Sequence, residues 1–299
     1  MSNDKVYPYG ALHKLQEVFF RLAASGLIPP DKFRAALPPE KDRKPSPEFP
    51  AIEIVSHCWQ YSTMLAYQLS SLVNYPPSKL SVLVTVFYSE TDKATVELLE
   101  FIGTHRVDNL TWNWQPLPEA QLFRRSIGRN RAALATRADW VWMTDCDIVF
   151  HKGCLDSLAQ ELRGKTDALV FPAEVQITDL LPDCSPMLRK DTGLELKEID
   201  TQQFRPHRRD RAKGPFQIVH GDVARTIGYC DRIALYQTPA AYWCKCYEDR
   251  AFRWLVGTQG TPVNIINACQ IRHIEKGRYR QKSLWSRLRG KIRRMQETK

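Results

Sequence analysis

The acidic tripeptide Asp145-Cys146-Asp147 is the part of the sequence whose residue types point most directly to chemistry. It stands at the end of a predicted strand, 141–144, and a bend there would turn both carboxylates toward one hard cation. Mg²⁺ and Mn²⁺ take oxygen ligands and commonly share them with substrate phosphates. The tripeptide therefore predicts a divalent-cation site formed by Asp145 and Asp147. The alternative is a turn or a helix N-cap without catalytic function, because Asp is common there.

The segments around this tripeptide alternate between strand and helix patterns. Apolar runs predict strands at 52–55, 80–87, 110–114 and 141–144, and helical patterns fall between them at 63–73, 95–103 and 129–138. Such alternation predicts βαβ units around a mostly parallel sheet that is buried on both faces. Ligands of α/β folds bind at the carboxyl ends of the strands, and the acidic tripeptide falls at such an end.

Four motifs follow one another in an order that matches a known family. Residues 127–135 (IGRNRAALA) run into the acidic tripeptide, 214–228 (GPFQIVHGDVARTIG) contain three glycines, and 247–257 (YEDRAFRWLVG) have two acids directly after the first residue. Together with 52–75 and 81–92, they resemble the "aRN-x-a … D-x-D" core, the acceptor-side glycine segment and the "EDxdlxxRlxxxG" helix of family 2 glycosyltransferases. The resemblance covers residues 51–275 and implies a single GT-A domain, a Rossmann-like α/β fold with a mostly parallel central sheet.

The resemblance implies transfer of a sugar from a nucleoside-diphosphate donor to a hydroxyl group. A Mn²⁺ or Mg²⁺ ion held by Asp147, and by Asp145, would offset the charge that grows on the diphosphate leaving group. Asp249 would be the general base that takes the proton of the acceptor hydroxyl, with Glu248 as the second choice. One base acting in line with the leaving group inverts the anomeric configuration, so we expect an inverting, hexosyltransferase-type enzyme. The alternative is that both acids interact only with a helix macrodipole.

Further donor-binding residues are expected around these acids. The resemblance implies that His273 is a C-terminal ligand of the metal or diphosphate. Arg129 would contact the donor phosphates or brace an acidic group. Ser56 and His57 stand at the end of the first strand, where the nucleotide of an α/β fold binds. For each histidine and for Arg129, a purely structural role is the alternative.

One motif departs from the family pattern. Where relatives have "VDDgStD", residues 86–92 read VFYSETD. Tyr88 would stack on the base of the nucleotide, or Glu90 would make the polar contact instead. Because of this departure, the resemblance gives no reason to choose uridine as the nucleoside of the donor, and the donor nucleotide is not assigned. A second departure, Ala251 in place of an acid, leaves Asp249 unaffected.

The net charge of +10 is concentrated in one terminal segment. Residues 276–299 contain ten Lys or Arg and one Glu, which leaves 33 basic and 32 acidic residues in the rest of the chain. Leu284, Trp285, Leu288 and Ile292 recur there at helical spacing. This pattern predicts a basic amphipathic helix that attaches to an anionic membrane surface. The alternatives are docking on the chain's own domain, a disordered tail or RNA binding, and the scarcity of aromatic residues disfavours nucleic acid.

Residues 1–50 predict an N-terminal extension, with an amphipathic helix over 11–24 and a proline-rich connector after it. The composition, 43% hydrophobic and 25% charged, excludes a disordered or fibrous protein, and no apolar stretch reaches the roughly 20 residues of a spanning helix. Without a signal-peptide pattern, we expect a soluble cytoplasmic protein on the inner face of the cytoplasmic membrane. Its eight cysteines are scattered, which predicts reduced packing residues rather than a zinc site.

The function expected from these patterns is synthesis of bacterial surface polysaccharide or lipopolysaccharide on a lipid-linked glycan acceptor. The enzymatic alternative is a nucleotidyltransferase, which would ordinarily have a Gly/Lys-rich loop after the first strand, where 56–59 (SHCW) offer none. The non-enzymatic alternative is a glycan- or nucleic-acid-binding protein of the same fold. Asp249 distinguishes an enzyme from a binding protein, because binding alone does not require a general base.

Overall fold

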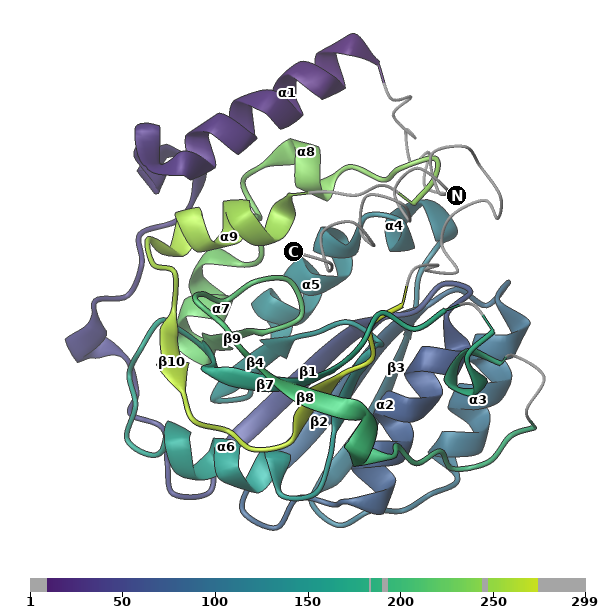
Figure 1. The fold of residues 1–299 in the computed structure, drawn as a ribbon. Helices are drawn as coiled ribbons and strands as arrows, with labels where there is room; N and C mark the ends of the chain where they lie inside the picture. Colours follow the sequence, from purple (N-terminus) through teal and green to yellow (C-terminus); the bar gives the residue numbers. More distant parts are fainter. Residues whose placement is uncertain (1–9, 183, 190–192, 244–246, 274–299) are drawn as a thin grey trace.

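The structure is a computed structural model that describes residues 10–182, 184–189, 193–243 and 247–273 (Figure 1). The predicted basic helix at 276–299 lies outside the described residues. The helices are α1 (Ala11–Leu22), η1 (Ala23–Leu27), η2 (Pro30–Phe33), η3 (Glu40–Asp42), α2 (Ser62–Asn74), α3 (Lys93–Gly103), α4 (Glu119–Leu122), α5 (Arg125–Ala135), α6 (Cys154–Leu162), η4 (Pro186–Leu188), η5 (Thr201–Gln203), α7 (Gly221–Ile227), α8 (Ala234–Gln237) and α9 (Glu248–Val256). The strands are β1 (Ala51–His57), β2 (Ser81–Tyr88), β3 (Leu110–Pro116), β4 (Trp140–Met143), β5 (Ile148–Phe150), β6 (Leu169–Pro172), β7 (Glu174–Thr178), β8 (Phe204–Arg208), β9 (Gln217–His220), β10 (Thr261–Val263) and β11 (Ala268–Gln270).

Seven strands form the central sheet, in the order β10-β6-β9-β4-β1-β2-β3. The pairs β1–β2, β1–β4, β2–β3 and β6–β10 are parallel, whereas β9 runs antiparallel to both of its neighbours. The strands β1, β2 and β4 are largely apolar because both faces of the sheet are covered there, whereas the edge strand β3 (LTWNWQP) is half-buried to exposed. The predicted fold class, an α/β domain with a mostly parallel central sheet, is confirmed.

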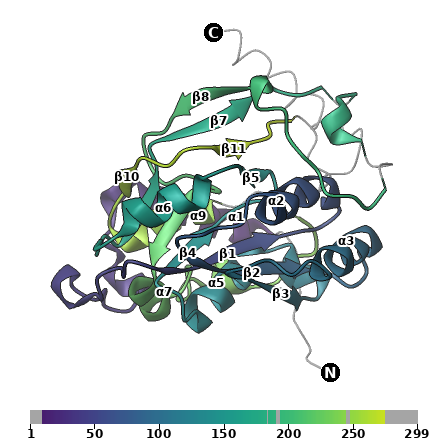
Figure 2. The ribbon, with the colours of Figure 1, turned by 90° about the horizontal axis from the view of Figure 1, so that it is seen from below.

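Two hydrophobic cores lie on the two faces of this sheet (Figure 2). On one face, α2, α3 and α6 pack together with a second sheet. On the other face, α5, α7, α8 and α9 pack with η1. The helix α9, which carries two of the expected functional acids, is therefore anchored by the second core rather than by the sheet alone.

A second, four-stranded sheet has the order β5-β11-β7-β8 and was not predicted from the sequence. Its strand β5 contacts α2, and β11 pairs antiparallel with β5 and parallel with β7. Directly after β11, the amide of Ile271 donates to the carbonyl of Asp147 at 2.9 Å. This sheet therefore returns the chain to the acidic tripeptide and sets His273 near it in the fold.

The helix α5 differs from its prediction in a way that matters for the site. The sequence predicts a helix at 129–138, but α5 spans Arg125–Ala135. The helix ends early because Thr136 is extended, and the Thr136 hydroxyl accepts a hydrogen bond from the amide of Ala138 at 3.2 Å. The helix begins one turn earlier than predicted, which places Arg125 on the same face as Arg129.

The N-terminal helix predicted at 11–24 is observed as α1. It packs through Phe20, whose ring lies 6.0 Å from that of Tyr236, and the following Ala23 is buried. The opposite stripe, Leu15, Val18, Phe19 and Leu22, has the spacing of one helix face and stays between 42% and 67% exposed. The helix α1 thus presents an apolar face to the outside of the described structure.

Most of the described cysteines are buried packing residues. Five of the six are buried in the cores, Cys184 is exposed, and all six are free thiols. Burial raises the pKa of the Cys269 thiol to about 12, so this group stays a neutral packing residue. Among the described helices, none is long and apolar enough to cross a membrane.

Candidate active site

The acidic tripeptide leaves the carboxyl end of β4, beside the end of β1. The Thr144 amide donates to the carbonyl of Val55 at 3.0 Å, which keeps the two strand ends together. On α2, the Gln68 side-chain amide donates to the carbonyls of Asp145 at 2.8 Å and Ile148 at 3.1 Å. The tripeptide is therefore a bend held from one side by a buried glutamine.

Ser56 takes part in the same bend. Its hydroxyl is fully buried and donates to Oε1 of Gln68 at 2.5 Å. This bond fixes the orientation of the Gln68 amide, whose nitrogen must face the two carbonyls. Ser56 thus has a positioning role in the structure, and its predicted contact with the nucleotide stays a prediction.

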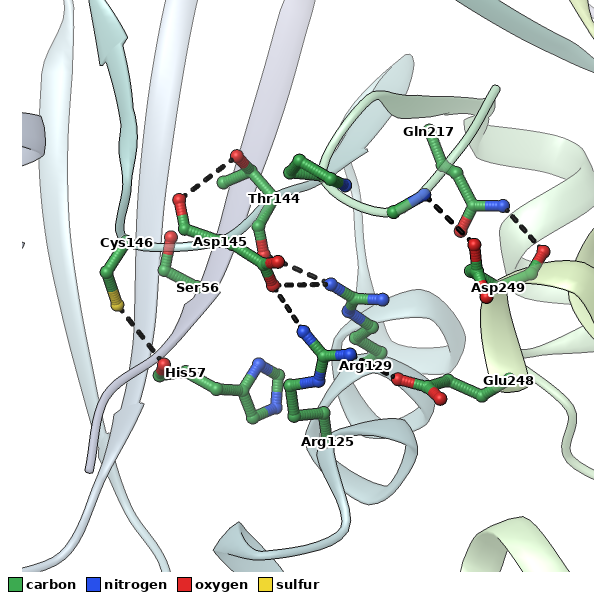
Figure 3. A network of polar contacts seen from close by, with 12 residues as sticks. Ser56, His57, Arg125, Arg129, Thr144, Asp145, Cys146, Gln217, Glu248 and Asp249 are labelled. Atoms are coloured by element: carbon green, nitrogen blue, oxygen red, sulfur yellow. Dashed lines mark hydrogen bonds and ion pairs between the residues drawn. The ribbon is translucent and has the colours of Figure 1, made fainter. Parts of the chain in front are cut away.

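Two arginines of α5 converge on the Asp145 carboxylate (Figure 3). Nη1 of Arg125 lies 2.5 Å from Oδ1 of Asp145, and Nη2 of Arg129 lies 3.3 Å from the same oxygen. Arg129 is completely buried, and its Nη2 also donates to the carbonyl of Thr144 at 3.1 Å. The negative charge of Asp145 is therefore compensated by protein, which makes Asp145 a weaker metal ligand than the sequence suggests. Of the two proposed roles of Arg129, the contact with an acidic group is the one observed.

Arg125 also connects the acidic tripeptide to the start of α9. Its Nη2 donates to Oε1 of Glu248 at 2.8 Å, while its Nη1 holds Asp145 (Figure 3). The other carboxylate oxygen of Glu248, Oε2, is buried and has no hydrogen-bond partner among the described residues. One guanidinium group thus joins Asp145 and Glu248, which are 103 positions apart in the chain. The site predicted from two separate motifs is a single cluster at one edge of the sheet.

Asp249, the predicted base, occupies a different environment from Glu248. Its Oδ2 accepts a hydrogen bond from the Gly214 amide at 3.1 Å and lies 3.5 Å from Nη1 of Arg253. Its side chain is 27% exposed, compared with 2% for Glu248. An acceptor hydroxyl can therefore reach Asp249, whereas Glu248 is enclosed and ion-paired. This difference favours Asp249 as the base, as the sequence predicts.

A chain of buried polar groups runs from Arg129 to Asp249. Nη1 of Arg129 donates to the Tyr229 hydroxyl at 3.0 Å, and this hydroxyl donates to Oε1 of Gln217 at 2.8 Å. The Gln217 side-chain amide then donates to the carbonyl of Asp249 at 3.0 Å. Burial raises the pKa of Tyr229, so its hydroxyl stays protonated and keeps donating. These hydrogen bonds fix the start of α9 relative to the end of β4.

His57 is buried at the end of β1. Its ring stacks on Phe87 with centroids 4.9 Å apart, and its carbonyl accepts a hydrogen bond from the Cys146 thiol at 3.2 Å. The space beside the ring exists because residue 128 is glycine: a Cβ atom there would lie 2.2 Å from Nε2 of His57. The glycine of the 127–135 motif therefore admits the imidazole against α5.

We expect Gly128→Ala to destabilise the protein by about 1–3 kcal/mol, the usual cost of overpacking a core. The added Cβ would also lie 2.8 Å from Cδ2 of Phe87, so neither ring has room to move. An alanine in an unobstructed helix would instead stabilise by about 1 kcal/mol. Urea denaturation measures the difference, with Gly103→Ala in the last turn of α3 as the control, where a Cβ meets only Nε1 of Trp114 at 3.4 Å. A Gly128→Ala protein at least as stable as wild type contradicts this account of the motif.

Tyr88 and Glu90 lie one strand away, at the end of β2. Tyr88 is half-buried, and burial followed by the negative charges of Glu90 and Glu100 raises the pKa of its hydroxyl. Glu90 is exposed in the turn that follows β2. Because β2 is parallel to β1 and β1 to β4, these two residues lie at the same edge of the sheet as the acidic tripeptide. Their contacts with the nucleotide base stay predictions.

Asp147 and His273 are the remaining candidates for metal ligands. The Asp147 side chain is 1% exposed, and His273 is 3% exposed with its ring against Tyr61, whose hydroxyl forms a hydrogen bond with Nε2. Within the described residues, no group of three or more His, Cys, Asp or Glu side chains is arranged to hold a metal ion. The donor set fits a cation that a diphosphate helps to bind, because Mg²⁺ typically takes one or two carboxylates plus phosphate oxygens. It does not fit a cage made by the protein alone.

The sequence analysis missed several residues that organise the site: Arg125, Gln68, Gln217 and Tyr229. Arg125 carries a usable signal, since it stands four positions before Arg129 and therefore on the same face of a helix. Gln68 lies in a run of otherwise apolar and small residues of α2, where a long polar side chain needs buried partners. No sequence signal links Tyr229 to Gln217.

No family model matches the chain, and no curated protein matches it. Among solved structures, residues 1–349 of TarS from S. aureus match with 15% identity and a TM-score of 0.43, over 76% of this chain and 61% of that chain. The mannosyltransferase PcManGT from Pyrobaculum calidifontis, in complex with GDP-Man and Mn²⁺, matches with 12% identity and a TM-score of 0.43, over 96% of this chain and 73% of that chain. The match thus spans less than two thirds of the TarS chain. The likeness to both structures is a partial one of fold.

Proposed function

We propose that this chain is a metal-dependent, inverting glycosyltransferase that moves a sugar from a nucleoside-diphosphate donor to a hydroxyl of a glycan acceptor. The observation that carries the proposal is the Arg125 bridge, which joins the acids after β4 to the acids of α9 in one site. A site for this reaction needs positive charge for the leaving diphosphate and a reachable base for the acceptor. The cluster offers both kinds of group at the carboxyl edge of the sheet, where α/β folds bind ligands.

The donor end of the proposed site is formed by Asp147 and the two arginines of α5. Asp147, with His273 beside it in the fold, would hold a Mn²⁺ or Mg²⁺ ion that offsets charge on the diphosphate. Arg125 is 18% exposed, so part of its side chain is open to solvent while Nη1 holds Asp145 and Nη2 holds Glu248. Its guanidinium would offer the diphosphate positive charge and its remaining N–H groups.

At the acceptor end, Asp249 would accept the proton of the attacking hydroxyl. The hydroxyl oxygen forms a bond to the anomeric carbon while the bond from that carbon to the diphosphate oxygen breaks, and its electron pair leaves with the diphosphate. Attack from the side opposite the leaving group inverts the configuration. The Gly214 amide, which donates to Oδ2 of Asp249, fixes the carboxylate in place for this step.

The proposal predicts that one nucleoside diphosphate-sugar raises the melting temperature only when Mn²⁺ or Mg²⁺ is present. A thermal-shift panel of UDP, GDP, dTDP and CMP sugars, with and without the metal, identifies the donor. The metal-dependent part of the shift should disappear in Asp147→Ala, because that carboxylate is the candidate ligand. Asp108→Ala is a matched control, since Asp108 is exposed before β3. If no nucleotide changes the melting temperature in any condition, the proposal fails.

We further propose that the acceptor is lipid-linked and that the protein works on the cytoplasmic face of a bacterial membrane. Two features support this: the basic residues of 276–299 and the exposed apolar face of α1, which Lys14 and Arg21 flank. Apolar side chains beside cations are the composition of elements that lie in an anionic membrane surface. Co-sedimentation with anionic vesicles tests the proposal, and it fails if the whole chain, a chain ending at residue 275 and the Leu15→Ser/Phe19→Ser protein bind equally.

A further inference from the structure

The open edge of the second sheet is lined with cations. Its outermost strand, β8, has the sequence FRPHR, and among the described strands it pairs with β7 alone. Arg205 stands opposite Ile177 and His207 opposite Val175, so both project from the sheet face that carries these buried apolar residues. Arg205 and His207 are nevertheless exposed. They therefore border the seam between the second sheet and the body of the domain.

Cations from two other segments gather around His207. Burial, and then the positive charges of Arg209, Arg272, Arg205 and Lys213, lower the pKa of His207. Lys213 comes from the loop after β8 and Arg272 from the segment after β11, so three separate parts of the chain place positive charge here. We call Arg205, Arg209, Lys213 and Arg272, which carry this positive charge, the cationic rim.

The acids that pair with Arg205 and Lys213 are exposed. Asp179 pairs with Arg205 at 3.1 Å and Asp210 with Lys213 at 2.7 Å, but all four side chains are about half exposed or more. Exposed pairs of this kind contribute at most about 1 kcal/mol, so an incoming anion can displace the carboxylates. Arg209 has no carboxylate within ion-pair distance among the described residues. It lies instead 4.3 Å over the ring of Phe216, and burial lowers its pKa to about 10.

The cationic rim adjoins both chemical ends of the candidate active site. Lys213 directly precedes Gly214, whose amide holds the Asp249 carboxylate. Arg272 directly follows Ile271, whose amide donates to the carbonyl of Asp147. A molecule bound along the rim therefore lies next to the proposed base and the proposed metal ligand.

We propose that the cationic rim binds the acceptor substrate, and that this acceptor is a glycan chain carrying oxyanions, either phosphate or carboxylate groups. The inference rests on the proposed function, because it names the substrate from which Asp249 takes a proton. Arginine recognises both oxyanions through paired hydrogen bonds. Oxyanions of a charged glycan can replace the exposed carboxylates of Asp179 and Asp210, whereas a neutral glycan cannot.

Single-stranded nucleic acid is the competing polyanion. Its binding sites combine positive grooves with aromatic side chains on which the bases stack. Along the described residues 204–216, Phe204 is half-buried and Phe216 is buried beneath Arg209, so neither offers an open stacking surface. The rim therefore favours a charged saccharide over a nucleobase.

The test is a titration of the full chain with polyphosphate, polygalacturonate, neutral dextran and poly(U) at two salt concentrations. In Arg205→Gln/Lys213→Gln, we expect the affinity for polyphosphate or polygalacturonate to fall about tenfold, with a weaker salt dependence because fewer counterions are released. The control Arg106→Gln/Arg137→Gln removes the same charge at exposed positions before β3 and β4, at the opposite edge of the main sheet. The preferred polymer identifies the oxyanion. Both exchanged pairs are at the surface, so the folded state is preserved.

Three results overturn the proposal: equal losses in the rim and control variants, dextran binding as tight as that of the charged glycans, or rim-dependent binding that is tightest for poly(U). The titration contains no nucleotide sugar, so its outcome is independent of the donor panel. Once the donor is known, the rim variant should raise the acceptor KM about tenfold and leave the donor KM within twofold. A rim that binds glycans while no donor binds would refute the proposed function and leave a glycan-binding site.

Discussion

Asp249→Asn should lower kcat for sugar transfer by about 10²–10⁴, the usual contribution of a general base, while donor affinity changes less than twofold. Asparagine keeps an oxygen that accepts the Gly214 amide bond, so the start of α9 keeps its shape. It cannot take the proton of the acceptor hydroxyl. The measurement is kcat with the donor that the thermal-shift panel identifies, alongside the donor dissociation constant.

Two variants make this prediction decisive. Asp108→Asn changes an exposed acid before β3 and should leave both quantities at their wild-type values. Glu248→Gln tests the second choice of base, which the structure shows enclosed beside Arg125. If Glu248→Gln removes transfer and Asp249→Asn does not, the assignment of the base is wrong. If neither variant affects transfer, the chain does not use α9 for catalysis.

The parallel half of the sheet was predictable because its strands are apolar on both faces. β2 and β4 are almost unbroken apolar runs, whereas β1 (AIEIVSH) contains the buried Glu53 among its apolar residues. The order of strands along the chain then places the acidic tripeptide at a carboxyl end. This part of the argument depends only on local patterns, and the structure bears it out.

The second sheet was not predictable for a physical reason. Its strands are three to five residues long, and β8 contains Pro206, which marks an edge position rather than a strand interior. β11 pairs with β7 across about 90 positions of sequence, and no local pattern encodes that register. As a result, the structure alone shows that the segment leading to His273 lies against Asp147.

Asp145 shows what a sequence motif predicts about a site and what it does not. The tripeptide alone indicates two equivalent carboxylates that face one cation. The structure separates them, since Asp145 is ion-paired to two arginines, one of which lies outside the region predicted as helix. A buried charge needs a partner of opposite charge, and a single sequence motif does not reveal which residue that partner is. The presence of an acidic site at the carboxyl edge of the sheet was predictable, but the different environments of Asp145 and Asp147 were not.

Removing the guanidinium that joins the two motifs should have the second large effect. Arg125→Met keeps an unbranched side chain but leaves Glu248, which is 1% exposed, without its cation. Breaking a buried pair costs about 3–5 kcal/mol, and we expect the lower end because Arg125 is 18% exposed. Urea denaturation measures the loss, and Arg137→Met at an exposed position is the matched control.

The double variant Arg125→Met/Glu248→Gln separates stability from function. A neutral glutamine no longer needs the cation, so most of the lost stability should return, and the two substitutions should be coupled by about 1–3 kcal/mol rather than additive. Donor affinity should stay low in the double variant, because the charge offered to the diphosphate is still missing. Additive stabilities would show that Arg125 and Glu248 do not interact as the geometry indicates. Restored donor binding would show that Arg125 only supports the fold, and the donor phosphates would then be bound through the metal ion that Asp147 would hold.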